Sequence, residues 1–513
     1  MAHPRQSVLI LTVILLAGSA LGRRFYSDDP LAKEPPPMAV GELRAEPDSD
    51  PGTFIHDTLR QRGQKDTPPP ALDINTIDEL PDSSWFTNRN GANALSNAGL
   101  AKGPGGNEPP AADQPWSIFE ADEGTSPIFR IEDSHGRRFA LRFDPKEYVE
   151  LSTGADVVGS KLFYALGYNV PDDYAVRFQR EQLHAGPGVH FLRDGQRVVL
   201  RESDIDHLLS LTPRYPDGSY RALASRLIEG SLLGPFEYSS TRGDDPNDTI
   251  PHERRRALRA LFVFSEWIDH IDTRVLGTLD TIQPINGVRA VRHFLTDFGS
   301  SFGSGNLRPK EAWEGHTYAV DFRWGLKEVL TLGAYSPKWA RTPPAIVTGA
   351  GSYEGDTFDP AAWKPAYPNA AFDCRTAADN FWAAKQIGAF TDDQIRALVR
   401  TGRYSDPKAV EAMVQAMILR RNKIVAYYFA RTLPLDRFEV NDGKLHYRDL
   451  GGNGNYTIAW TRFENETDAK FGLKAEPTFA VPRSPGYLAA DIGDGTHRLT
   501  VYVHDGRVVG LIR

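Results

Sequence analysis

Two short groups of residues carry side chains that could do chemistry together: His270-Ile271-Asp272 and Asp297-Phe298-Gly299. The segment between them predicts a β-hairpin, because Asn286-Gly287 is the strongest short-range signal for a two-residue turn. With that turn, antiparallel pairing places Asp297 opposite Leu276, four residues after Asp272. Two carboxylates then converge at the open end of one hairpin, which is one way to build a site for a metal ion and phosphate.

Strands earlier in the chain are expected to bring further polar groups to this region. Residues 128–132 and 138–143 predict a second strand pair, and period-two alternation separates Arg142 from the apolar face. Residues 220–228 predict another strand, which ends at Glu229-Gly230.

Helices are predicted around these strands. Ser152-Thr153 is typical of a helix cap, and that helix runs to about residue 166 with Asp156 in its first turn. Residues 252–268 predict one continuous helix that delivers the chain to His270. Asp406-Pro407 predicts the start of a long helix that continues to about residue 431.

Length and composition divide the chain into several parts of an α+β protein. A chain of 513 residues predicts two or three domains. Residues 23–115 are rich in proline and glycine and predict an extended or partly disordered arm that buries little, apart from a docked Trp85-Phe86 pair. Residues 116–432 form the main domain, and residues 436–513 predict a small all-β domain of the sandwich or barrel type.

The N-terminus is typical of an export segment. Arg5 precedes an apolar run from Val8 to Ala17, and Ala20-Leu21-Gly22 is a candidate cleavage site. Residues 1–22 therefore predict a signal peptide, or alternatively an uncleaved anchor that associates the protein with a membrane. Either interpretation predicts an exported protein of the periplasm or cell envelope.

Charge and cysteine content exclude some classes of partner and site. The formal net charge is -8, and no basic stripe stands out, so nucleic acid is not expected as a partner. The single cysteine, Cys374, excludes an intramolecular disulfide and a zinc site of the multi-cysteine kind.

The two chemical motifs resemble those of a known family. Residues 270–277, His-Ile-Asp-Thr-Arg-Val-Leu-Gly, look like the catalytic loop of protein kinase-like folds, and Asp297-Phe298-Gly299 looks like their magnesium-binding motif. Residues 139–144 followed by residues 154–171 are similar to the small lobe of HipA-type and spore-coat CotH-type atypical kinases. The resemblance covers roughly residues 116–430 and implies a two-lobed kinase-like domain.

The resemblance also implies a role for individual residues, with ATP and Mg²⁺ or Mn²⁺ as cofactors. It implies an ATP-dependent phosphotransferase that acts on a protein or small-molecule hydroxyl. The implied roles are Asp272 as the catalytic aspartate, Arg274 as a basic residue of the same loop, Asp297 as the metal ligand, Arg142 in the place of the phosphate-binding lysine, Asp156 as its acidic partner, and Glu229-Gly230 at the hinge that contacts adenine.

Two departures from the family pattern keep a second hypothesis open. Gly277 stands where an asparagine would supply a second metal ligand, and Arg142 replaces lysine, with which it is not interchangeable. The alternative is a catalytically inactive kinase-like binding or scaffold protein of the envelope.

Two other aspartates come into consideration for the site. Asp280 is too far along the hairpin to replace the missing asparagine, whereas Asp269 could exchange roles with Asp272.

A third hypothesis comes from Gly299-Ser300-Ser301-Phe302-Gly303, which fits the G-x-S-x-G pattern of hydrolases. That pattern requires a helix directly after the serine turn. Glycines and serines continue through Gly305, so a flexible loop is the favoured interpretation.

Overall fold

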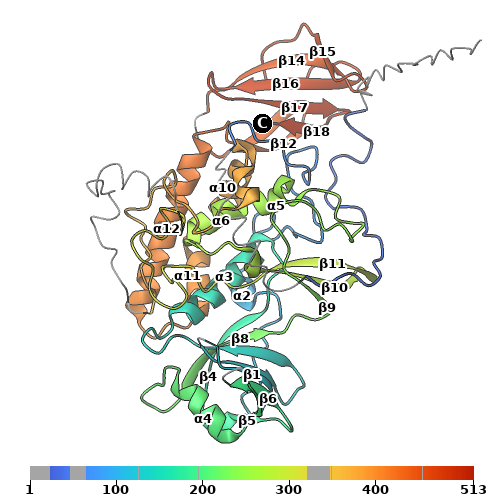
Figure 1. The fold of residues 1–513 in the computed structure, drawn as a ribbon. Helices are drawn as coiled ribbons and strands as arrows, with labels where there is room; N and C mark the ends of the chain where they lie inside the picture. Colours follow the sequence, from blue (N-terminus) through green and yellow to red (C-terminus); the bar gives the residue numbers. More distant parts are fainter. Residues whose placement is uncertain are drawn as a thin grey trace, which may run out of the picture.

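The computed structural model describes residues 23–46, 65–124, 126–193, 196–320, 347, 349–452 and 454–513. The chain is 23% helix and 26% strand in several sheets, which confirms the α+β class. One sheet lies at one end of the molecule, the helices lie in the middle, and the C-terminal strands lie at the other end (Figure 1). The predicted signal peptide or anchor lies outside the described residues, and no described helix is long and apolar enough to cross a membrane.

The first sheet has eight strands in the order β4-β8-β3-β2-β1-β6-β7, with β5 paired to β1. The predicted pairing of residues 128–132 with residues 138–143 is confirmed, and Phe139, Leu141 and Phe143 are buried in one core. The strands are β1 (Trp116–Asp122), β2 (Ile128–Glu132), β3 (Arg138–Arg142), β4 (Asp173–Phe178), β5 (Leu183–Ala185), β6 (His190–Arg193), β7 (Gln196–Val199) and β8 (Tyr220–Arg226).

Helix α3 (Leu151–Leu166) packs against this sheet but begins differently from the prediction. Ser152 and Thr153 lie inside the helix, and their backbone N–H groups donate to the carboxylate of Asp144 at 2.9 Å. Asp144 therefore accepts the hydrogen bonds from backbone N–H groups that a cap residue would otherwise accept. As a result, Asp156 lies in the second turn of α3, and its predicted place in the first turn is wrong.

The hairpin between the two chemical motifs has the predicted register. In the three-stranded sheet of β9 (Ser231–Gly234), β10 (Thr278–Ile285) and β11 (Val288–Leu295), Thr278 pairs with Leu295 and Ile285 with Val288. Asn286 and Gly287 have φ values of 52° and 81°, as a type I′ turn requires. The N–H of Thr296 donates to the carbonyl of Gly277 at 2.8 Å, so the pairing extends toward Asp297.

The predicted continuous helix over residues 252–268 is wrong. The chain forms a 3₁₀ turn (His252–Arg254) and two helices, α5 (Arg256–Arg259) and α6 (Leu261–Ile268). Arg255 is extended, with φ −92° and ψ 123°, which interrupts the helical hydrogen bonds. The carboxylate of Asp73 accepts the N–H groups of Arg256 and Ala257 at 2.5 and 3.2 Å, so a distant residue caps α5.

Most of the remaining helices pack around α6 and α3, whereas α4 packs against the first sheet beside β5. The predicted start at Asp406-Pro407 is confirmed, because Asp406 caps α12 and Pro407 is its first residue. The helices are α2 (Asn97–Lys102), α4 (Glu202–Ser210), α9 (Ala370–Asp373), α10 (Ala377–Gly388), α11 (Asp392–Thr401) and α12 (Pro407–Phe429), and two further 3₁₀ turns are η1 (Arg180–Gln182) and η3 (Val275–Gly277).

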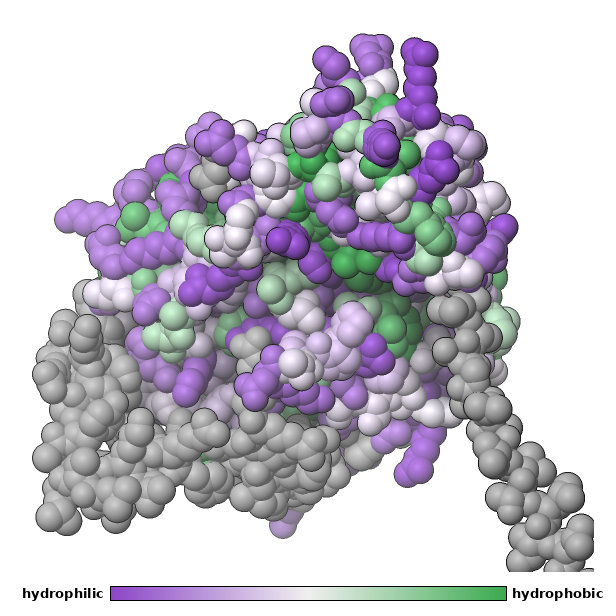
Figure 2. Space-filling view, turned by 90° about the horizontal axis from the view of Figure 1, so that it is seen from above, coloured by the Kyte–Doolittle hydropathy of each residue, from purple (hydrophilic) through white to green (hydrophobic). Residues whose placement is uncertain are grey.

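The C-terminal strands form a two-stranded ribbon and a five-stranded sheet that share one core around Leu435, Trp460 and Val501. The ribbon is β12 (Leu435–Asn441) and β13 (Lys444–Asp449), and the sheet is β14 (Thr457–Glu464), β15 (Ala469–Gly472), β16 (Tyr487–Gly493), β17 (Arg498–His504) and β18 (Arg507–Ile512). Seen from above, hydrophilic residues dominate this end of the molecule, and hydrophobic residues gather only in small patches (Figure 2).

The described part of the arm is more deeply packed than predicted. Phe25 is 2% exposed and lies against Phe463 and Tyr502 of the C-terminal sheet. Trp85 and Phe86 are also buried, as expected, and the indole of Trp85 stacks on His293 of β11 with the ring centroids 3.5 Å apart. The expectation that the rest of the arm buries little is wrong at Phe25, Val40 and Leu100, whose side chains are all buried.

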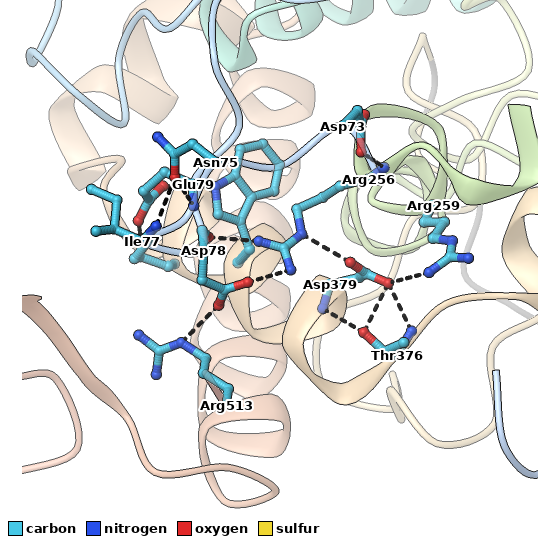
Figure 3. Close-up of polar contacts among 12 residues, drawn as sticks. Asp73, Asn75, Ile77, Asp78, Glu79, Arg256, Arg259, Thr376, Asp379 and Arg513 are labelled. Atoms are coloured by element: carbon cyan, nitrogen blue, oxygen red, sulfur yellow. Dashed lines mark hydrogen bonds and ion pairs between the residues drawn. The ribbon is translucent and has the colours of Figure 1, made fainter. Parts of the chain in front are cut away.

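A buried network of arginines and aspartates joins the arm, the helices and the end of the C-terminal sheet (Figure 3). Arg256 donates to Asp78 of the arm at 2.6 Å and to Asp379 of α10 at 2.8 Å. Arg259 donates to the second oxygen of Asp379 at 3.1 Å, and Arg513 donates to the second oxygen of Asp78 at 3.0 Å. Arg256, Arg259 and Asp379 are at most 1% exposed, so each charge depends on its partners rather than on water.

Replacing Asp379 with alanine is expected to destabilise the protein strongly, because buried Arg259 loses its carboxylate partner and buried Arg256 loses one of its two. A buried ion pair that loses one partner typically costs about 3–5 kcal/mol of unfolding free energy. Urea unfolding followed by tryptophan fluorescence measures this loss. Glu411→Ala, which removes the exposed partner of Arg396, is the control and should change stability little. Equal losses in the two variants would contradict the importance of the network.

Candidate functional site

Three carboxylates and one guanidinium lie close enough to act on one another's charge where the first sheet, α3 and the segment after β11 come together. Arg142 ends β3, Asp156 lies on α3, Asp173 begins β4, and Asp297 follows β11. Asp156 accepts the backbone N–H of Phe298 at 2.6 Å, which joins α3 directly to the segment that carries Asp297. Three of these four residues, Arg142, Asp156 and Asp297, were singled out from the sequence, and the fold brings them together.

Electrostatics couple these four groups. Burial opposes the positive charge on Arg142, but the carboxylates of Asp156, Asp297 and Asp173 outweigh that effect and raise its pKa. Burial also raises the pKa of Asp156 well above its usual value, and the negative charges of Asp297 and Asp173 raise it further. Lys161 also acts on Asp173 but is paired with Asp172 at 3.8 Å, so the negative charges still outnumber the positive ones. The ionised form of this cluster would therefore be stabilised by additional positive charge.

Asp173 was not identified from the sequence. It is 2% exposed, accepts a hydrogen bond from Ser225 on the neighbouring strand β8, and has a pKa raised to about 6 because of its burial. The available signal was a pair of aspartates, Asp172-Asp173, directly before an apolar strand. Such a pair is more often a solvated turn, so sequence alone could not select it.

The segment at Asp297 is tightly fitted to α3. Asp297 has a φ of 59°, in the left-handed region that non-glycine residues seldom occupy. Phe298 is buried against Phe163 with ring centroids 4.8 Å apart, and a Cβ at Gly159 would lie 2.5 Å from its Cβ. A Cβ on Gly299 would lie 3.2 Å from Asp156. Small residues at these positions therefore let the segment approach the helix closely.

Asp272 and Arg274 form a paired unit in the predicted catalytic loop. Both oxygens of the Asp272 carboxylate accept from Arg274, at 2.7 and 2.6 Å, and the guanidinium lies over the ring of Tyr367. Asp272, Arg274, Gly277 and Phe298 line one small pocket, but Asp297 is not among the described residues that line it.

Asp269, the alternative to Asp272 in the predicted catalytic loop, lies in a different environment. It is buried, pairs with Lys310 at 2.9 Å, and accepts from the indole of Trp363 at 2.7 Å. Burial raises its pKa, but Lys310 and Arg420 outweigh that effect and lower it to about 2. Asp269 therefore fixes the loop in place, and the half-buried Asp272 is the better candidate for contact with a substrate.

Glu229 and Gly230 lie apart from the acidic cluster, in the exposed connection between β8 and β9. The carbonyl of Glu229 accepts from the side chain of Gln283 at 2.7 Å. Gly230 has a φ of 104°, and a Cβ there would lie 2.4 Å from the carbonyl oxygen of Ile282. The backbone path of this connection therefore requires glycine.

Asp280 and Ser301, which the sequence did not favour as site residues, lie outside the cluster. Asp280 pairs with His293 at 2.6 Å and both are buried, so Asp280 does not reach the cluster, as the register predicted. Ser301 of the G-x-S-x-G pattern is fully buried and bonded to His270 at 3.1 Å. No helix follows Ser301 within the described residues 302–320, so the strand-turn-helix context of a hydrolase nucleophile is missing there.

The acidic groups fit only one mode of metal binding. Within the described ranges, no group of three or more histidine, cysteine, aspartate or glutamate side chains could hold an ion. Mg²⁺ commonly binds through one or two carboxylates together with water and substrate phosphates. Asp297, with Asp156 and Asp173 nearby, fits a metal that arrives with a phosphate and does not fit a site built from protein ligands alone.

Comparisons with family models, with curated proteins and with solved structures found no match to this chain. The function must therefore be argued from the geometry of the cluster itself.

Replacing Asp173 with asparagine is expected to stabilise the protein in a pH-dependent way. Because the pKa of Asp173 rises from 3.8 to about 6, the folded state favours the neutral form, and stability is lost as the pH rises through 6. Asparagine stays neutral, so the variant should gain up to about 3 kcal/mol at pH 8 and almost nothing at pH 4. Melting temperatures between pH 4 and 8 in EDTA measure this. A pH-independent difference would contradict it.

Proposed function

We propose that this protein is an ATP-dependent phosphotransferase of the atypical kinase type, acting on a protein or small-molecule hydroxyl in the cell envelope. The observation that carries the proposal is the cluster in which Asp156 holds the backbone of Phe298, next to Asp297, while the charges of both aspartates act on the guanidinium of Arg142. Phosphoryl transfer depends mainly on positioning and on charge stabilisation rather than on covalent chemistry. A cation beside carboxylates that can share a divalent ion supplies both requirements.

In this proposal each residue has one task. Arg142 contacts the phosphates, and its planar guanidinium can donate two hydrogen bonds to one phosphate group. Asp297 would hold Mg²⁺ or Mn²⁺, which neutralises the phosphate oxygens when it is bound. Asp156 holds the backbone of Phe298 and so positions Asp297. Asp272 orients the substrate hydroxyl and accepts its proton, after Arg274 releases part of the carboxylate.

The proposed domain is two-lobed. The eight-stranded sheet with α3 would be the small lobe, and the hairpin with α5 to α12 would be the large lobe. Glu229-Gly230 joins the two, and its exposed backbone is the proposed contact for adenine. The N-terminal segment, as a cleaved signal or an anchor, would place this domain in the periplasm or at the envelope membrane.

A second candidate function is a catalytically inactive kinase-like binding protein. Two observations favour it: Gly277 has no side-chain oxygen for a second metal ion, and Arg274 engages both oxygens of Asp272. The two candidates differ in whether nucleotide binds and whether phosphate is transferred.

Nucleotide with metal is expected to stabilise the folded protein. Ligand at 100 times its Kd adds about 2.7 kcal/mol by mass action, so millimolar ATP with Mg²⁺ or Mn²⁺ should raise the melting temperature by several degrees. Asp297→Asn should abolish the shift. Asp505→Asn is the matched control, because Asp505 is an exposed aspartate that also has a positive φ. No shift in the unaltered protein would contradict nucleotide binding.

Asp272→Asn is expected to separate binding from catalysis. The variant should keep the nucleotide-dependent rise in melting temperature but lose at least 100-fold in phosphate transfer, because the hydroxyl proton has no acceptor. Transfer is measured as release of ADP with and without an added hydroxyl substrate. Binding without any turnover in the unaltered protein would favour the inactive alternative.

A further inference from the structure

A second cavity lies at the junction between the arm, the helices and the C-terminal sheet, next to the buried arginine network (Figure 3). Its volume is about 730 Å³, which is in the range of small-molecule sites. Six of its lining side chains are basic or can become so: Arg24, Arg256, Arg431, His497, Arg498 and Arg513. We propose that this cavity binds a small molecule that carries two or more oxyanion groups, phosphate or carboxylate, independently of the proposed nucleotide site.

The charge of the cavity is not balanced by its own acidic residues. Asp78 is the one acidic side chain among the described residues that line it. Its two oxygens are already engaged by Arg256 at 2.6 Å and by Arg513 at 3.0 Å. Arg24 and His497 have partners of their own, Asp468 and Asp494.

Arg431 and Arg498 are the two guanidinium groups left for a ligand. Both are exposed, and no carboxylate of the described residues forms an ion pair with either. Arg431 donates to the carbonyl of Tyr427 at 2.6 Å, and its guanidinium carbon lies 3.3 Å from the centre of that ring. This stacking fixes the plane of the guanidinium while other N–H groups remain available, which suits the forked recognition of an oxyanion.

The positions of these two arginines suggest the size of the ligand. Arg431 follows α12, whereas Arg498 begins β17, so they come from different parts of the molecule. A ligand with a single small anionic group would satisfy one of them, and a ligand with two such groups could bridge both. Arg431 also lines an adjoining cavity of about 320 Å³ with Asn380 and Trp363, which could hold the body of a larger ligand.

Bridging would also have a mechanical effect. The cavity is walled by the arm, the start of α10, the end of α12 and the last strand, so a bound oxyanion would hold the C-terminal sheet against the helices. The ligand should therefore raise the temperature at which these parts separate.

The test uses the full chain in buffer freed of metal ions with a chelating resin, with inorganic pyrophosphate or citrate as the probe, at ionic strength matched with sodium chloride. Isothermal titration calorimetry should show binding to the unaltered protein and to Asp297→Asn alike, because no metal or nucleotide site is involved. The double variant Arg431→Gln/Arg498→Gln should bind at least tenfold more weakly. The control is Arg400→Gln/Arg483→Gln, which makes the same change in charge at exposed arginines outside the cavity and should bind normally.

The outcomes separate the proposals. Binding of pyrophosphate alone identifies the ligand class as phosphorylated, binding of citrate alone identifies it as a polycarboxylate, and binding of both supports a general oxyanion site. No binding of either, equal weakening in the control variant, or loss of binding in Asp297→Asn would overturn the inference. Melting temperatures without ligand verify that each variant is folded. Failure here would leave the proposed phosphotransferase untouched, since that function is tested with metal and nucleotide.

Discussion

The ion pairs around Arg256 are the constraint on which the rest of the structure depends. One guanidinium binds Asp78 of the arm and Asp379 of α10, and through Asp78 it is linked to Arg513 beyond the last strand. Because these groups are buried, each charge needs all of its partners, and the segments cannot separate without exposing an unpaired ion to a medium that solvates it poorly. The network also fixes the start of α5, and so the path through α6 to His270.

In the candidate site, unlike the arginine network, the buried charges do not balance one another. Around Arg142 the carboxylates of Asp156, Asp173 and Asp297 are gathered rather than neutralised, and burial raises the pKa of Asp156 and Asp173. Such crowding lowers stability in the free protein and is characteristic of functional sites. A divalent ion that arrives with a phosphate would reduce the repulsion between the carboxylates. The loss of stability in the free protein would then be explained by the proposed function of the cluster.

The two proposed sites would therefore bind anions by different physical means. At the acidic cluster a phosphate would need a metal ion to overcome the repulsion of the carboxylates, with Arg142 as an additional cation. At the junction cavity, Arg431 and Arg498 would bind an oxyanion directly, because the nearby Asp78 is already neutralised by its arginine partners. In these proposals, one site would support a reaction on phosphate and the other would hold the C-terminal sheet in position.

Local chemistry in the sequence determined the turn at Asn286-Gly287 and hence the hairpin register that pairs Thr278 with Leu295, because turn type fixes strand pairing over a few residues. Only the tertiary structure decided the break before Arg256, where Asp73 caps α5 from a distant part of the chain, and the arrival of Asp173 beside Arg142. The deep packing of Phe25 was decided in the same way. These features depend on contacts between residues far apart in sequence, and a local pattern of residue types carries no information about which distant partner will be present.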